Sequence, residues 1–169
     1  WSSDVCSSDL GSFISMKEPV IRFSAITARR IAETATFTTD DGSFGTRGRV
    51  TDVLGRVIEE CRTDAVYACG PMPMLRAVTA VAGAHGIPVQ VAVEETMACG
   101  TGICMTCVIP VVGEDGITRM VRSCVDGPVF RGEQVRFDDV GTIPFDALGA
   151  PGWKGSSAAR AAESARDIA

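Results

Sequence analysis

Four cysteines in the second half of the chain have a spacing that suits metal chemistry. Cys99, Cys104 and Cys107 are separated by four and then two residues, and Cys124 follows after another sixteen. Three clustered thiolates and one distant thiolate are the plant-type spacing of a [2Fe-2S] cluster. Two irons bridged by two sulfides need four thiolates in two pairs. A tight loop can direct three of them inward, and a strand arriving from elsewhere brings the fourth.

The residues between these cysteines suit a backbone that approaches a cluster closely. Backbone N–H groups must point at the cluster sulfurs, because those hydrogen bonds stabilise the reduced state. Small residues allow this approach, and the loop contains Ala98, Gly100, Thr101 and Gly102. Zinc remains an alternative, although it usually takes two C-x2-C-like pairs and the chain has one. Inert buried cysteines also remain open, but they would not be expected to gather three in nine residues.

The composition narrows the class of protein. Of 169 residues, 46% are hydrophobic and 22% are charged, so the chain can bury a core and is not expected to be disordered. The net charge of -5 disfavours a nucleic-acid binder. No apolar run approaches the ~18 residues of a membrane span. The chain has a single histidine, His85, so a Ser-His-Asp triad and a two-histidine metal site are nearly excluded.

The cysteines and the first residues also indicate a compartment. Residues 1–10 lack the basic and apolar regions of a secretory signal, and the odd count of seven cysteines argues against a closed disulfide framework. We therefore expect reduced thiols and a cytoplasmic location. Residues 1–10 repeat Ser-Ser-Asp and resemble a translated sequencing adapter, so we expect them, with Cys6, to be a non-native head. Residues 11–31 remain unassigned.

Apolar periodicity predicts alternating strands and helices up to residue 93. The strands are expected over residues 20–26, 32–38, 64–69 and 88–93, and the helices over residues 51–60 and 71–83. This order predicts a parallel sheet with helices packed on it. Thr51 is expected to cap the first helix. The residues expected to face the core are Val53, Leu54, Val57 and Ile58 in the first helix, and Met74, Leu75, Val78, Val81 and Ala82 in the second.

The pattern changes after residue 93. Residues 94–107 form a Gly- and Cys-rich loop. Residues 107–112 and 117–122 flank a Gly-Glu-Asp-Gly turn, which predicts a hairpin. A last strand is expected over about residues 129–137. Residues 142–169 are rich in Pro, Gly, Ala and Ser, and we expect a flexible tail.

The loop resembles that of a known family. Residues 93–107 read VEETMACGTGICMTC and are similar to the cluster loop of the electron-transfer subunit of class B dihydroorotate dehydrogenase. The similarity extends to residues 39–43, 69–75 and 124–130, so it covers roughly residues 32–141. It implies that one [2Fe-2S] cluster is bound by Cys99, Cys104, Cys107 and Cys124.

The resemblance also implies a nucleotide site. In the wider ferredoxin-reductase-like flavoprotein family, the matching Cys-Gly-Pro turn lies beside the nicotinamide, near the place of hydride transfer to flavin. That role would fall to Cys69, Gly70 and Pro71, with Cys69 as the candidate catalytic residue. They follow a predicted parallel strand, and such strand ends bind ligands. Candidates for contacting NAD in the earlier loop are Asp40, Asp41, Gly42 and Ser43. For both segments an ordinary turn is the alternative.

The implied fold class is α/β with two modules. Residues 32–93 would be the C-terminal part of an incomplete, parallel-sheet NAD-binding domain of the ferredoxin-reductase type. Residues 94–141 would be a small, mainly β [2Fe-2S] module. The family's FAD-binding β-barrel has no counterpart before residue 32, so we expect a fragment that cannot carry out the whole reaction by itself.

The implied function is electron transfer in de novo pyrimidine (UMP) biosynthesis. Electrons would pass from an FMN-containing dihydroorotate dehydrogenase catalytic subunit, the expected partner, through the cluster and FAD to NAD+. One alternative is a subunit of a related NAD(P)H ferredoxin reductase or sulfide dehydrogenase. An alternative of another class is a small zinc-binding module.

Overall fold

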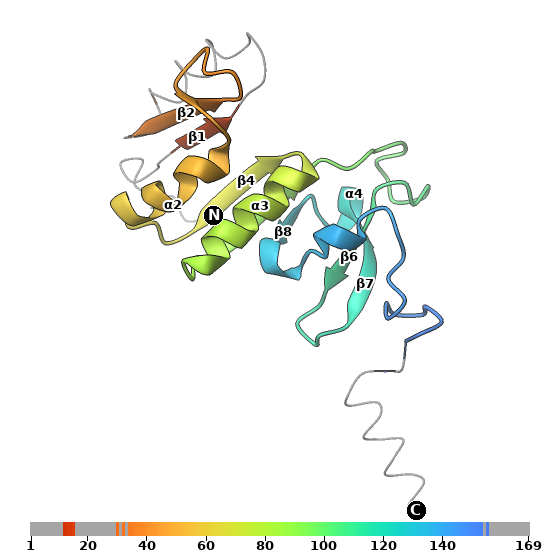
Figure 1. The fold of residues 1–169 in the computed structure, drawn as a ribbon. Helices are drawn as coiled ribbons and strands as arrows, with labels where there is room; N and C mark the ends of the chain where they lie inside the picture. Colours follow the sequence, from red (N-terminus) through yellow and green to blue (C-terminus); the bar gives the residue numbers. More distant parts are fainter. Residues whose placement is uncertain (1–11, 16–29, 31, 33, 154, 156–169) are drawn as a thin grey trace, which may run out of the picture. The chain divides into compact units, whose positions relative to one another are not determined.

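The structure, a computed structural model, describes residues 12–15, 30, 32, 34–153 and 155 (Figure 1). The chain divides into two compact units between Thr63 and Asp64. The expected strand over residues 20–26 lies outside the described residues. So do the head, residues 1–10, and the end of the tail, residues 156–169. No helix within the described ranges is long and apolar enough to cross a membrane.

The first unit contains a parallel sheet in the order β1-β2-β3. β1 spans Ser12–Ser15, β2 spans Ala35–Thr39 and β3 spans Thr46–Arg47. Phe37 of β2 is buried, and its ring meets Phe44 edge-on with centroids 5.2 Å apart. β2 begins three residues later than expected, and the short strand β3 was not expected within the loop that follows it.

Helix α2 spans Val50–Glu60 and has the predicted buried face. The expectation that Thr51 caps it is wrong, because Arg49 is the N-cap and Thr51 lies within the first turn. The backbone N–H of Arg49 donates to Oδ2 of Asp52 at 2.8 Å. The carboxylate that reaches back to this N–H therefore places the N-cap two residues earlier than expected. The buried side chains are Val50, Val53, Leu54, Val57 and Ile58.

The second unit contains a sheet in the order β4-β5-β8. β4 spans Val66–Gly70 and β5 spans Val89–Val93; they are parallel, with Val66 opposite Val89 and Gly70 opposite Val93. Helix α3, Met72–Ala84, connects them and packs on both (Figure 1). The shared core comprises Leu75, Val78 and Ala82 of α3 with Val89, Val91 and Val93 of β5. The predicted stripe is confirmed at these helix positions, whereas Met74 and Val81 are half-buried.

The strands expected in one parallel sheet belong to two sheets. β2 pairs with β1 and β3, while β4 and β5 pair with each other in the second unit. The second sheet is mixed, because β8, Val129–Arg131, runs antiparallel to β5.

The strand expected over residues 129–137 is wrong beyond Arg131. The 3-10 helices η1, Gly132–Gln134, and η2, Phe137–Asp139, follow instead. A Cβ on Gly132 would lie 2.6 Å from Oγ1 of Thr79 and 3.2 Å from Cβ of Val89. The chain therefore passes close to α3 and turns at a residue without a side chain.

The predicted hairpin is confirmed. β6 spans Val108–Val112 and β7 spans Thr118–Arg122, paired antiparallel with Val108 opposite Arg122. The backbone N–H of Gly113 donates to the Ile117 carbonyl at 2.9 Å and closes the turn. A short helix, α4, spans Ser123–Asp126 and directly follows β7.

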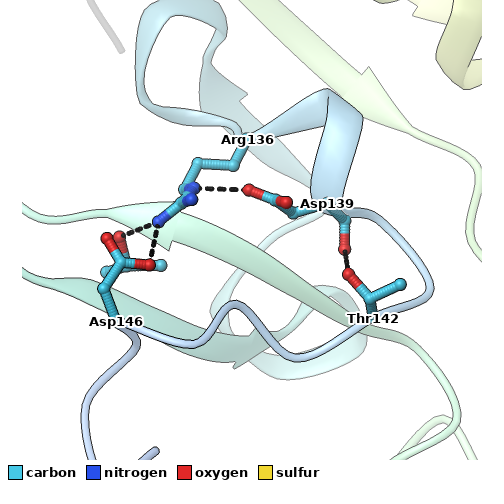
Figure 2. A network of polar contacts seen from close by, with 5 residues as sticks. Arg136, Asp139, Thr142 and Asp146 are labelled. Carbon is cyan, nitrogen blue, oxygen red and sulfur yellow. Dashed lines mark hydrogen bonds and ion pairs between the residues drawn. The ribbon is translucent and has the colours of Figure 1, made fainter. Parts of the chain in front are cut away.

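Arg136 fastens the segment beyond residue 141 to this hairpin (Figure 2). Its guanidinium donates to Oγ1 of Thr118 at 3.0 Å, to Asp139 at 2.6 Å and to Asp146 at 2.8 Å. The backbone N–H of Leu148 also donates to the Thr118 carbonyl at 2.8 Å. The first part of the expected tail, up to residue 148, therefore makes specific contacts with β7.

Candidate iron–sulfur centre

The loop after β5 folds around the sulfur of Cys99. The backbone N–H groups of Thr101, Ile103 and Cys104 each donate to this sulfur at 3.4 Å. Hydrogen bonding from Cys104 and then Thr101 lowers the pKa of Cys99 to about 5. The thiolate that results is the form that binds a metal. The expectation that loop amides point at sulfur is confirmed for Cys99.

Two glycines allow the backbone to fold around the sulfur of Cys99. Gly100 has φ +67° and Gly102 has φ +79°, both in the left-handed region that glycine adopts without steric cost. The hydroxyl of Thr106 lies 3.0 Å from the sulfur of Cys104 and donates to it. This hydroxyl was not singled out from the sequence, although its place inside the cysteine motif was a usable signal.

The hairpin brings the distant cysteine to the loop. Cys107 directly precedes β6 and Cys124 lies in α4 directly after β7, so the antiparallel register places them at the same end of the hairpin. The Ser123 N–H donates to the Cys107 carbonyl at 3.0 Å. The sixteen residues between the two cysteines are thus the hairpin and Ser123.

The four thiols form two interacting pairs. Hydrogen bonding from the Cys124 backbone, then its side chain, lowers the pKa of Cys107, while the Cys107 thiol raises the pKa of Cys124. The backbone N–H of Cys104 donates to the sulfur of Cys99, and Cys104 lowers the pKa of Cys99. The charge of Cys99 also raises the pKa of Cys124, although less than Cys107 does. The pairs are therefore Cys99 with Cys104 and Cys107 with Cys124.

These residues fit a binuclear cluster by their donor set. They supply four sulfur ligands in two pairs, with backbone N–H groups already directed at the sulfurs, which is the environment such clusters need. Within the described residues, no three His, Cys, Asp or Glu side chains are grouped as a site for a single metal ion. A cluster of two irons takes its protein ligands two to each iron, so it does not require such a group. All six described cysteines are free thiols.

The predicted nicotinamide residues lie at the end of β4. Gly70 has φ +146°, and a Cβ there would approach Cε of Met74 to 2.8 Å. Pro71 is the N-cap of α3, and its carbonyl accepts from the N–H groups of Met74 and Leu75. Strand end and helix start therefore meet at one tight turn.

The thiol of Cys69 is exposed and donates to Oε1 of Glu94 at 3.6 Å. Partial removal of this largely exposed thiol from water, followed by the charge of Glu94, raises the pKa of Cys69. Glu94 lies one residue beyond β5, at the same edge of the sheet. It was not singled out from the sequence, since only the parallel register brings it to Cys69.

The other predicted nucleotide residues lie in the first unit, in the turn after β2. The Ser43 N–H donates to Oδ1 of Asp41 at 2.9 Å, and this contact lowers the pKa of Asp41. Gly42 has φ +76°, and its N–H donates to the Thr39 carbonyl at 3.3 Å. Asp40 is exposed. The geometry is that of an Asx turn, so a role of these residues toward NAD stays a prediction.

Part of the second unit matches a known protein family. Residues 94–136 match the family model described as the iron-sulfur cluster binding domain of dihydroorotate dehydrogenase B. This stretch begins at the end of β5 and contains all four candidate ligands. This part of the chain is therefore similar to iron–sulfur cluster binding domains.

The similar proteins share one name, that of a single subunit of an enzyme. A protein of Methanocaldococcus jannaschii named a probable dihydroorotate dehydrogenase B (NAD(+)), electron transfer subunit, is 40% identical over 112 residues, which are 66% of this chain and 41% of the relative. The corresponding subunit of Bacillus caldolyticus is 49% identical over 98 residues, 57% of this chain and 35% of the relative. The resemblance to these electron-transfer subunits is confirmed. The chain spans less than half the length of either relative.

A solved structure is similar over more of the chain. It covers 77% of this chain and 45% of the solved one, with 31% sequence identity and a TM-score of 0.60. Its title describes an NADH-dependent reduced ferredoxin-NADP oxidoreductase studied for flavin-based electron bifurcation. The α/β class is confirmed by this similarity together with the mixed sheets and helices described above.

Proposed function

We propose that Cys99, Cys104, Cys107 and Cys124 hold one [2Fe-2S] cluster. The proposal rests chiefly on the three backbone N–H groups that donate to the Cys99 sulfur. The hairpin register, which places Cys107 and Cys124 at the same end of the hairpin, supports it. Cys99 and Cys104 would serve one iron, and Cys107 and Cys124 the other. A cluster bound there exchanges one electron at a time. The protein's part is to present thiolates and to direct N–H donors at their sulfurs.

The chain then acts as the electron-transfer component of a dihydroorotate dehydrogenase. Its relatives are named electron transfer subunits of dihydroorotate dehydrogenase B (NAD(+)). By the family resemblance, electrons would pass from an FMN-containing catalytic subunit through the cluster and FAD to NAD+. Cys69, with Gly70 and Pro71, would flank the nicotinamide at the carboxyl edge of β4 and β5, where parallel sheets bind ligands. Residues 40–43 of the first unit remain candidates for contacting NAD. The proposed location is the cytoplasm, in keeping with the free thiols.

The proposed modules follow the order of the elements. Residues 32–93 contain the strands β2, β4 and β5 separated by the helices α2 and α3, with the short strand β3 before α2. This order supports the C-terminal part of a ferredoxin-reductase-type NAD-binding domain. Residues 94–141 would be the mainly β cluster module, and the family match lies within them. Residues 142–169 would follow as a tail whose first part contacts the hairpin.

A second candidate is a component of a ferredoxin–NAD(P) oxidoreductase. The solved structure with 31% identity favours it, because its title names that activity. The partner distinguishes the two candidates. Co-purification with an FMN-containing protein that oxidises dihydroorotate supports the first, and reduction of ferredoxin without such a partner supports the second.

The cluster is tested by anaerobic reconstitution of the purified chain. We expect about two irons and two acid-labile sulfides per chain. Serine at any one of the four cysteines should lower both contents. Serine at Cys61, an exposed free thiol on the first unit, should lower neither. Stoichiometric zinc without sulfide would contradict the proposal and support the zinc-binding module instead.

A further inference from the structure

Arg122 connects the cysteine loop to the hairpin. It is the last residue of β7 and precedes Cys124 by two positions. Its Nη1 donates to the carbonyl of Gly102 at 3.0 Å, across twenty positions of sequence. Among the described residues, no other side-chain hydrogen bond reaches from the hairpin into this loop.

Gly102 is in close contact with the hairpin end of the module through its carbonyl and its Cα. Its carbonyl accepts from Nη1 of Arg122 at 3.0 Å. The space beside its Cα is occupied, since a Cβ would lie 2.6 Å from Cγ2 of Val125. Gly102 lies between Thr101 and Ile103, whose N–H groups donate to the sulfur of Cys99, so its position affects where these donors point.

Asp126 holds the arginine in place. The backbone N–H of Arg122 donates to Oδ2 of Asp126 at 2.9 Å, and the Nε of Arg122 lies 3.8 Å from the same oxygen. The arginine is thus anchored by α4 at its backbone, while its guanidinium reaches the loop. A guanidinium donates from several nitrogens in a fixed plane, which suits a residue that joins two segments.

We infer that Arg122 is a positioning residue of the cluster: it fixes the loop through Gly102 and adds a positive charge beside the metal ligands. The inference rests on the proposed function and deepens it. Reduction makes a cluster more negative, so a nearby positive charge and a correctly placed N–H both favour the reduced form. Loss of the guanidinium should lower the reduction potential and loosen the loop.

Arg119 provides a matched control on the same strand. Like Arg122, it pairs with a carboxylate four residues away in sequence, with its Nη2 2.7 Å from Asp115. Its guanidinium also donates to the Ile117 carbonyl, at the turn end of the hairpin. Substitution of Arg119 therefore removes the same charge and a closer ion pair, but no contact with the cysteine loop.

The first test compares reconstituted Arg122→Gln, Arg122→Lys and Arg119→Gln chains with the unsubstituted chain. We expect Arg122→Gln to have a more negative midpoint potential and to release iron to a chelator several times faster. The midpoint potential of Arg122→Lys should stay close to that of the unsubstituted chain, because lysine keeps the positive charge. This variant should still release iron faster, because lysine lacks the planar guanidinium that donates from several nitrogens. Arg119→Gln should match the unsubstituted chain. Equal potentials and equal iron release in Arg122→Gln and Arg119→Gln would overturn the inference.

The second test needs no cluster. Deuterium uptake by the metal-free chain should rise in peptides covering residues 100–106 in Arg122→Gln, and should stay unchanged there in Arg119→Gln. Unchanged uptake in Arg122→Gln overturns the positioning role. A chain that takes up zinc without sulfide overturns the proposed function, and the uptake experiment then still decides whether Arg122 orders the loop.

Discussion

The sulfur of Cys69 and Oε1 of Glu94 lie 3.6 Å apart, at the point where the parallel strands β4 and β5 both end. The thiol belongs to the predicted nicotinamide turn, and the carboxylate begins the segment that leads to Cys99 five residues later. A single hydrogen bond therefore joins the two parts of the proposed electron path. Its physical effect is on the protonation of Cys69.

Glu94→Gln should lower the pKa of the Cys69 thiol. Partial removal from water and the negative charge of Glu94 raise this pKa, and the substitution removes the second cause. Since the thiolate is the reactive form, alkylation of Cys69 should begin at lower pH in the variant. Residue-resolved mass spectrometry of alkylation between about pH 7 and 10 measures the change around the ordinary thiol pKa of about 8.5. Glu95→Gln is the control, and an equal shift in that variant would contradict the assigned cause.

Gly102→Ala should impair cluster retention more than Gly116→Ala. Both glycines have positive φ, +79° and +74°, so alanine costs about 1–2 kcal/mol of backbone strain at either position. A Cβ at Gly102 would also lie 2.6 Å from Cγ2 of Val125. A Cβ at Gly116 would have open space around it. Iron content after gel filtration measures the difference. Equal retention would show that the loop adjusts without loss.

Leu75→Ala should destabilise the second unit by about 2–5 kcal/mol. Leu75 is completely buried in α3, against the strands of its sheet. Tyr67 of β4 is 71% exposed, so Tyr67→Ala should change the unfolding free energy by only about 0.5 kcal/mol or less. Denaturant unfolding of the metal-free chains measures both values. Similar losses in the two variants would show that α3 is not part of the core.

Arg136→Gln should weaken the attachment of residues 142–148. Arg136 lowers the pKa of Asp146, so this carboxylate contributes stability above its unfolded pKa of about 4 and loses it as the pH falls through the lower folded value. The variant should lose this dependence on pH. Proteolysis of the segment between about pH 6 and 2.5, with an acid-active protease at the lower end, follows the effect. Arg131→Gln, which removes only the exposed pair with Glu133, is the control.

The sequence alone determined the features that depend on local spacing. The interval of four and two residues between Cys99, Cys104 and Cys107 predicted the chemistry of the centre. A period of 3.6 residues predicted the buried faces of both helices, and apolar runs around a Gly-containing turn predicted the hairpin. Such patterns are readable because each follows from the geometry of one helix, strand or loop.

Tertiary structure decided the contacts between segments distant in sequence. The hairpin register brings Cys107 to Cys124, the parallel register brings Cys69 to Glu94, and the side chain of Arg122 reaches Gly102 twenty positions earlier. The early end of the strand at Arg131 likewise follows from the approach of Gly132 to α3. These contacts depend on pairing and packing between separate elements, so no periodicity in the amino-acid sequence records them.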